Sequence, residues 1–222
     1  MQILYEDSDL IAINKPSGMP THTTLDESRE NLFSQVKKFL SQREQQEVYV
    51  GLHHRLDKDT SGVILLTKTK AANLWVSQLF AKHQIKKKYV AIVSYKETFL
   101  KKKWSVGNYL KDTRTKERIR KMIVVKRGGI YAETEFALLK KYSTVLLIEA
   151  FPKTGRMHQI RVHLAGCGLP ILGDSLYGKK TECVPRCMLH AQSLVFFHPL
   201  LNKEITIVAP VPEDFKQALL RM

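Results

Sequence analysis

The spacing of apolar residues along the chain predicts many short strands with a few helices between them. Eight short runs are rich in β-branched and aromatic residues, as strands are. They lie at 10–14, 62–67, 89–95, 122–125, 132–139, 144–151, 193–197 and 204–209. Gly128 and Gly129 separate two of these runs and indicate a hairpin turn there.

Apolar residues recur at helical spacing in three further segments, at 29–43, 70–84 and 156–167. A fourth helix is expected after Pro212, because Glu213 and Asp214 suit the first turn of a helix. The strands outnumber the helices and do not alternate with them strictly. This order favours an α+β fold over a doubly wound parallel sheet.

Length and composition limit the class of protein. The 222 residues suit one domain, and the apolar share of 44% is enough for a core. No apolar run approaches the roughly 20 residues that span a bilayer. The first ten residues carry acidic groups before any basic one, so no secretory signal is expected. These features predict a cytoplasmic protein.

The three cysteines, Cys167, Cys183 and Cys187, fit a reducing compartment. Cys183 and Cys187 lie near His190, which raises the alternative of a zinc site. Their spacing is irregular and a fourth ligand is not evident, so free cysteines are the expectation.

The chain is strongly basic, with 36 Lys and Arg against 21 Asp and Glu and a formal charge of +15. This charge favours a nucleic acid as the partner over plain solubility or a membrane surface. The basic segment 111–121 is either a mobile arm that meets phosphates or the solvated tip of a hairpin.

The stretch "HRLDKDTSG" at 54–62 concentrates ionisable groups just before a strand. The cations Arg55 and Lys58 favour the ionised form of Asp57, and a positioned carboxylate can act as a nucleophile or a base. Gly62 permits a tight turn into the strand. The alternative is an ordinary polar turn, in which aspartates are common.

A second cluster, "TGRMHQIRVHLAGCGLPILGDSLYG", covers 154–178. On a helix, His158 and Arg161 would share one side, and an arginine there could fix a carboxylate by two hydrogen bonds. The alternative is a basic helix that only binds phosphate. The spacing of His158 and His163 does not place both on one face, so no metal site is expected.

Taken together, these stretches resemble the RluA family of pseudouridine synthases. The resemblance rests on motifs in a fixed order over most of the chain. They are "NKPSGMPTH" (14–22), "HRLDKDTSGVILLTKT" (54–69), "IKKKYVAIV" (85–93), "AETEF" (132–136), "KTGRMHQIRVHLAGCGLPILGDSLYG" (153–178) and "LHAQSLVFFHP" (189–199).

The resemblance implies an enzyme that converts uridine in RNA to pseudouridine without cofactor or metal. It implies that Asp57 is the essential carboxylate, that Tyr89 packs on the target base, and that Arg161 pairs with Asp57. Arg55 matches the residue that fills the gap left by the flipped uridine. The other residues expected to contact RNA are His54, Arg156, His158, Lys86 and Lys88.

The resemblance also implies the pseudouridine synthase fold, a bent, mixed and mostly antiparallel sheet flanked by helices, with the catalytic cleft across its middle. Residues 1–222 are expected to form a single catalytic domain without an N-terminal S4 module. RNA choice would then come from loops such as 20–48 and 96–121. The substrate is expected to be structured ribosomal or transfer RNA, and the protein to be a monomer.

Two other function classes stay open at this level. One is a non-catalytic module that binds or folds RNA on the same scaffold, against which the joint presence of Asp57, Tyr89 and Arg161 argues. The other is a hydrolase that uses Asp57 and Asp59 as a carboxylate pair. Side chains two residues apart in a turn fit poorly with carboxylates that must flank one bond.

Overall fold

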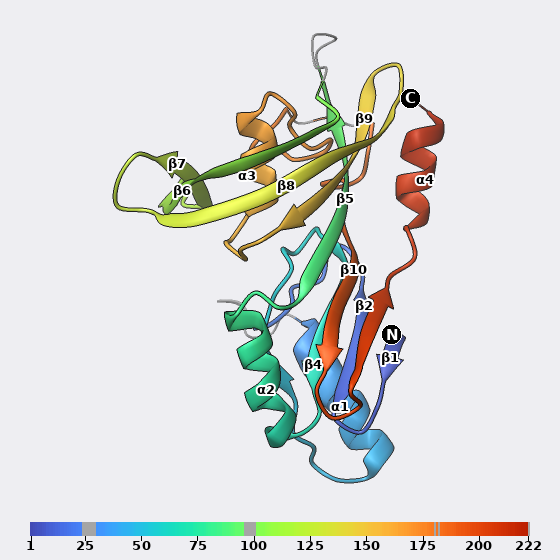
Figure 1. Cartoon of the computed structure of the whole chain (residues 1–222). Coiled ribbons are helices and arrows are strands. Elements are labelled where there is room, and N and C mark those ends of the chain that lie inside the picture. Colours follow the sequence, from blue (N-terminus) through green and yellow to red (C-terminus); the bar gives the residue numbers. More distant parts are fainter. Residues whose placement is uncertain (24–29, 96–100, 180, 182, 222) are drawn as a thin grey trace. The chain divides into compact units, whose positions relative to one another are not determined.

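The computed structural model describes residues 1–23, 30–95, 101–179, 181 and 183–221 (Figure 1). Within these residues the chain forms eleven strands and four helices, which confirms the α+β class. The chain divides into two compact units. Unit 1 comprises Met1–Lys86 with Ala191–Pro210, and unit 2 comprises Lys87–His190 with Val211–Met222. A single domain over 1–222 stays a prediction.

In unit 1 the strand order is β1-β2-β4-β10, with β11 beside β10 and β3 beside β4. The pairs β1–β2, β2–β4 and β10–β11 are antiparallel. The strands are β1 (Gln2–Glu6), β2 (Leu10–Lys15), β3 (Gly51–Leu52), β4 (Ser61–Thr67), β10 (Leu189–His198, which begins in unit 2) and β11 (Lys203–Val208). The helices are α1 (Leu32–Glu44) and α2 (Lys70–Ala81).

Strand β4 is the central element of unit 1, because all seven of its residues are buried. A continuous apolar run of this kind is typical of a strand covered on both faces. Gly62, the second residue of this strand, has a φ of +119°. A Cβ at this position would lie 2.1 Å from the carbonyl oxygen of Ala191, so only glycine fits. Gly62 thus lies at the entry to the strand, as predicted, but the turn itself is at Lys58 and Asp59.

Unit 2 has the strand order β5-β9-β8-β6-β7, and these four pairs are antiparallel. The strands are β5 (Lys86–Ser94), β6 (Lys103–Arg114), β7 (Arg120–Val125), β8 (Ile130–Lys141) and β9 (Val145–Pro152). The helices are α3 (Gln159–Gly166) and α4 (Glu213–Leu220). Val162 of α3 packs in one buried cluster with Leu110, Met122 and Ala132 of the sheet. The core of unit 2 therefore carries α3 directly on the sheet.

The predicted helices are present with shifted ends. Helix α1 begins after Asn31, whose side chain accepts a hydrogen bond from the N–H of Ser34 as an N-cap. Helix α3 begins at Gln159, so the prediction that His158 lies on this helix is wrong. His158 is the residue before the first turn, with φ at 52° in the left-handed region.

The strand predictions missed β1, β3 and β6. The turn at Gly128 and Gly129 is present, but it does not close a hairpin. It joins β7 and β8, which both pair with β6 and not with each other. The basic segment 111–121 belongs to the β6–β7 hairpin, which matches the second of the two alternatives raised for it. The loops 20–48 and 96–121 lie in part outside the described residues.

No helix of the described residues is long and apolar enough to cross a membrane. The cysteines at 167, 183 and 187 are free, as expected.

Candidate active site

The turn that carries Asp57 is held on both sides by an earlier segment of unit 1. The hydroxyl of Thr21 donates to the carbonyl oxygen of Leu56 at 2.8 Å and accepts from the Leu56 N–H at 3.2 Å. The N–H of Gly18 donates to the carbonyl oxygen of Lys58 at 2.9 Å. Because Leu56 and Lys58 flank Asp57, the backbone at the carboxylate is fixed from both neighbours, as precise chemistry requires.

Lys15 completes this support from beneath the turn. Its side chain is fully buried, and its ammonium donates to the carbonyl oxygens of Pro16 (2.9 Å), Met19 (2.8 Å) and Lys58 (2.9 Å). A buried cation is costly unless its protons are all bonded, and three carbonyl acceptors meet that need. Sequence reasoning assigned no role to Lys15. We name the set Lys15, Gly18 and Thr21 the turn clamp.

His54 contacts the strand that follows the turn. Its Nε2 accepts a hydrogen bond from the N–H of Leu65 at 2.9 Å, and its ring stacks on Phe80 with centroids 4.8 Å apart. A nitrogen that accepts cannot carry a proton, so His54 is neutral with its proton on Nδ1. This geometry makes His54 a support of the turn. Its expected contact with RNA stays a prediction.

Arg55 is exposed beside the same turn. Burial, and then the positive charge of Arg55, lower the pKa of His22 below its usual value. The guanidinium of Arg55 therefore lies near the 14–22 motif, and Asp57 is half-buried two residues further on. One rigid turn thus carries an exposed guanidinium, that of Arg55, and a half-buried carboxylate, that of Asp57.

In unit 2, Arg161 is fixed by a buried carboxylate. Its Nε and one terminal nitrogen donate to the two oxygens of Asp174, both at 2.8 Å. Asp174 is 1% exposed and also accepts from the N–H groups of Leu176 and Tyr177. Burial alone would raise the pKa of Asp174, but these hydrogen bonds and the charge of Arg161 lower it overall. The bidentate bond locks the plane of the guanidinium.

Tyr177 brings His158 and Arg161 to one place. Its hydroxyl accepts from the N–H of Met122 at 2.7 Å and bonds to Nδ1 of His158 at 3.0 Å. The guanidinium carbon of Arg161 lies 5.2 Å from the centre of the Tyr177 ring, and Nζ of Lys121 lies 5.1 Å from it. His158 and Arg161 thus both contact Tyr177, although they do not share the side of a helix that was predicted for them.

Tyr89 lies on β5, opposite Ala150 of β9, and packs partly buried against the core of unit 2. Lys86 and Lys88, predicted to bind RNA, already have acidic neighbours. Nζ of Lys86 is 3.9 Å from Glu204, and Nζ of Lys88 is 3.5 Å from Glu149. Such pairs on a surface are weak, so both lysines remain able to exchange partners.

Arg156 and Lys87 lie together at the end of β9. The Nε of Arg156 donates to the carbonyl oxygen of Tyr131 at 3.0 Å, and Nζ of Lys87 donates to that of Thr154 at 3.2 Å. Burial, and then the charge of Arg156, lower the pKa of Lys87 to about 8. The sequence predicted RNA contacts for Lys86 and Lys88 and no role for Lys87. Successive side chains of a strand point to opposite faces, so Lys87 of β5 lies on the other face from Lys86 and Lys88. This alternation was the signal that could have distinguished Lys87.

The predicted site residues therefore form two groups. Arg55, His54 and Asp57 belong to one turn of unit 1. Tyr89, Arg161 and the basic residues near them belong to unit 2. The predicted pairing of Arg161 with Asp57 joins residues of different units and stays a prediction.

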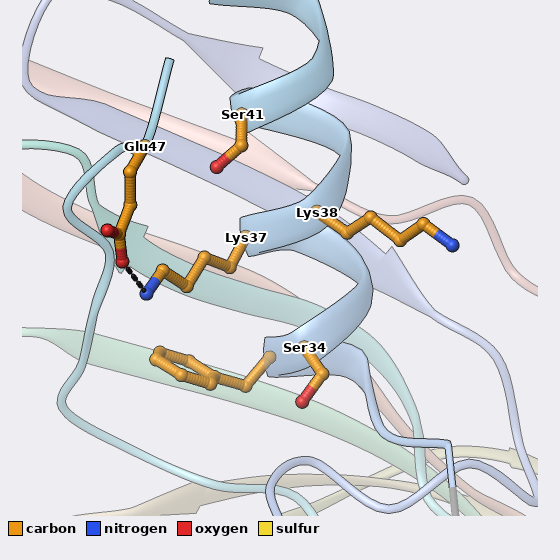
Figure 2. Close-up of a pocket in the computed structure, with 6 residues that line it drawn as sticks. Ser34, Lys37, Lys38, Ser41 and Glu47 are labelled. Atoms are coloured by element: carbon orange, nitrogen blue, oxygen red, sulfur yellow. Dashed lines mark hydrogen bonds and ion pairs between the residues drawn. The ribbon is translucent and has the colours of Figure 1, made fainter.

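One surface hollow on α1 includes none of these residues (Figure 2). Lys37 pairs with Glu47 at 2.8 Å, and Lys38 adds a second cation to the lining. It is lined by Phe33, Ser34, Lys37, Lys38, Ser41 and Glu47. Over the parts of the chain that the structure describes, no group of three or more His, Cys, Asp or Glu residues could hold a metal ion.

Residues 9–166 match the family described as RNA pseudouridylate synthase. The chain belongs to this family. Membership makes it an RNA-modifying isomerase and confirms the resemblance to the RluA type.

Similar proteins extend the match over nearly the whole chain. The chain is 39% identical to a ribosomal large subunit pseudouridine synthase C of Buchnera aphidicola subsp. Schizaphis graminum, over 98% of this chain and 69% of the relative. It is 32% identical to a ribosomal large subunit pseudouridine synthase D of Zymomonas mobilis, over 100% of this chain and 72% of the relative.

The solved structure of human RNA Pseudouridylate Synthase Domain Containing 4 has a TM-score of 0.75 with this chain. It is 28% identical and covers 99% of this chain and 92% of its own. The predicted pseudouridine synthase fold is thereby confirmed.

Proposed function

We propose that this RNA pseudouridine synthase acts on ribosomal large subunit RNA and that Asp57 is its essential carboxylate. The clamp around Asp57 carries the proposal, since backbone bonds on both sides of one residue indicate that its position matters. The choice of RNA is supported by relatives named for the ribosomal large subunit. The formal charge of +15 supplies attraction to a polyanion of this kind.

The reaction rearranges one nucleotide. The bond between C1′ of the ribose and N1 of uracil breaks, the uracil turns, C5 bonds to C1′, and a proton leaves C5 while N1 gains one. Asp57 acts at C1′ or removes a proton from the sugar. All atoms stay in the product, so the proposal includes no cofactor and no metal.

Access to that bond requires the uridine to leave its stack, which costs a few kcal/mol. Tyr89 would offset part of this cost by packing on the flipped base, and Arg55 by filling the gap in the helix. Arg161 would pair with Asp57 and keep it charged while the sugar gains positive character. The bidentate bond to Asp174 supports this role, because it holds Arg161 in one orientation before substrate arrives.

Further basic residues would meet the RNA backbone. We assign phosphate contacts to Arg156, His158, Lys86 and Lys88, whose side chains are partly or fully exposed. We also propose that the enzyme works as a monomer in the cytoplasm.

The test uses ribosomal RNA transcripts and a set of transfer RNAs labelled with tritium at uridine C5. Each is incubated with the wild-type chain and with Asp57→Asn, without added metal. Isomerisation releases the label, so release by wild type alone from ribosomal RNA is the expected result. Release from transfer RNA only would overturn the choice of substrate. Comparable release by Asp57→Asn would overturn the role of Asp57.

Asp59→Asn is the matched control, because it removes a carboxylate from the same turn. It is expected to retain most activity, because the proposal gives the Asp59 carboxylate no part in the reaction. Tight RNA binding by wild type without any release of tritium would favour the alternative, a non-catalytic module that binds RNA.

A further inference from the structure

Lys87 differs from the lysines on either side of it in what surrounds its charge. Lys86 and Lys88 each lie within 4 Å of a carboxylate, whereas no carboxylate of the described residues lies within that distance of Lys87. Its one hydrogen-bond partner is the carbonyl oxygen of Thr154. An ammonium has three protons to donate, so Lys87 keeps capacity for a further acceptor.

A second cation stands beside it. Arg156 repels Lys87 strongly enough to contribute to its lowered pKa of about 8. Arg156 also has no carboxylate partner within the described residues, and its Nε donates to the carbonyl oxygen of Tyr131. Two uncompensated cations side by side are unfavourable unless an anion joins them. An approaching anion would offset this repulsion and raise the pKa of Lys87 again.

The loop 154–156, which carries Arg156 and bonds to Lys87, is held in place by Gln159. The buried side chain of Gln159 accepts at Oε1 from the Thr154 hydroxyl (2.7 Å) and from the N–H of Arg156 (3.0 Å). Its Nε2 donates to the carbonyl oxygen of Glu133 at 2.9 Å. The loop 154–156 is therefore anchored to β8. Such anchoring orients a binding site before the ligand arrives.

There is also room beside the ammonium. A Cβ built on Gly155 would lie 3.7 Å from Nζ of Lys87 and meets no other atom within 4 Å. Side chains two residues apart on a strand share one face, with Cα atoms about 7 Å apart. Lys87 and Tyr89 of β5 are related in this way. The cation thus lies along the same face as the tyrosine assigned to the target base.

We propose that Lys87 and Arg156 together bind one phosphate of the RNA backbone next to the target uridine. This rests on the proposed function, in which Tyr89 packs on that uridine. A base stacked on Tyr89 brings its neighbouring phosphates to the same face of β5. Lys87 and Arg156 would then hold the RNA strand at the point where the target nucleotide leaves the stack.

The test compares Lys87→Met with the matched control Lys153→Met. Both remove one charge near Thr154, but Lys153 already pairs with Glu135 at 2.9 Å. Binding of a fluorescent short RNA stem-loop with one loop uridine is measured between about 50 and about 200 mM salt. One lost phosphate contact lowers the slope of log affinity against log salt by about one.

Lys87→Met is expected to bind about tenfold more weakly at the lowest salt. The difference in RNA affinity between this variant and wild type should shrink by about threefold across the salt range, because the variant's slope is less steep. Lys153→Met should keep the wild-type slope, and Lys87→Arg should restore it. Thermal melting of each variant checks that it is folded.

The same variants are assayed for tritium release to separate outcomes. A higher KM with kcat changed less than about threefold supports phosphate binding. A fall in kcat with unchanged affinity and slope would overturn it and assign Lys87 to proton transfer instead. If wild type converts no RNA, the proposed function fails, while the salt slopes still decide whether Lys87 and Arg156 hold an anion.

Discussion

The ammonium nitrogen of Lys15 lies 2.9 Å from the carbonyl oxygen of Lys58, the residue directly after Asp57. Lys15 is fully buried and is the last residue of β2. It therefore ties the candidate catalytic turn to a buried strand of unit 1. The ammonium of Lys15 is thus a structural cation, separate from the exposed cations that are proposed to contact RNA.

Lys15→Met should remove the ammonium donor from three carbonyl oxygens, although that of Lys58 keeps the N–H of Gly18. Unfolding free energy is expected to fall by about 2–4 kcal/mol, and turnover by at least about tenfold, because the turn loses its anchor. Denaturant titration and tritium release measure the two effects. Lys37→Met, which breaks only the surface pair with Glu47 seen in Figure 2, should change stability by less than about 0.5 kcal/mol. Equal effects of the two substitutions would contradict this role.

Asp174→Asn should release Arg161 from its locked orientation. Breaking a buried ion pair costs about 3–5 kcal/mol of stability, and kcat is expected to drop more than RNA affinity does. Kinetics well below the melting temperature separate these effects. Asp112→Asn serves as the control, because its pair with Arg120 is exposed. A variant with normal kcat would show that Arg161 needs no partner.

Glu6 should make stability depend on pH in the acid range. The hydrogen bond from Arg43 lowers its pKa most, burial opposes this, and Lys68 lowers it further, to about 2. Because the pKa of Glu6 is lower in the folded state than its unfolded value of 4.5, its ionised form stabilises the folded state above about pH 4.5. This stabilisation is lost as the pH falls from about 4.5 towards 2.

Wild type should therefore exceed Glu6→Gln by about 1–2 kcal/mol near neutral pH, after allowance for solvent screening, and the two should converge near pH 2. Urea unfolding of both chains at several pH values measures the difference. A gap that stays constant down to pH 2 would contradict the assignment to this carboxylate.

His54→Ala distinguishes support of the turn from contact with RNA. Loss of the acceptor for the Leu65 N–H and of the stack on Phe80 should cost about 1–3 kcal/mol of stability. The salt dependence of RNA binding should not change, because the ring is neutral in this geometry. A slope reduced by about one would instead show that His54 meets a phosphate.

The sequence predicted those elements whose apolar pattern is strong. Strand β4 and helix α2 were found because their patterns are uninterrupted. Strand β6 was missed because its exposed lysines and Asp112 hide the alternation, although Leu110 is fully buried. Its pairing with both β7 and β8 supplies the stability that its own side chains do not indicate.

The residues proposed for the site could be named from the sequence, but the groups that hold them could not. Asp57 and Arg161 lie in recognisable motifs. The partners that hold them are distant in sequence, as with Lys15 and the Lys58 carbonyl, or depend on a turn, as with Asp174 and Arg161. Such contacts depend on tertiary folding, which local patterns do not encode.

The clamp also closes a loop of chain. Thr21 and Leu56 are joined by two hydrogen bonds, so everything between them, helix α1 included, leaves and returns at a fixed pair of points. The entropy of closing a loop grows only with the logarithm of its length, by about 0.6 kcal/mol for each doubling. Insertions or deletions in this stretch should therefore leave the carboxylate where it is, and the length of the loop is free to diverge among enzymes that share one chemistry.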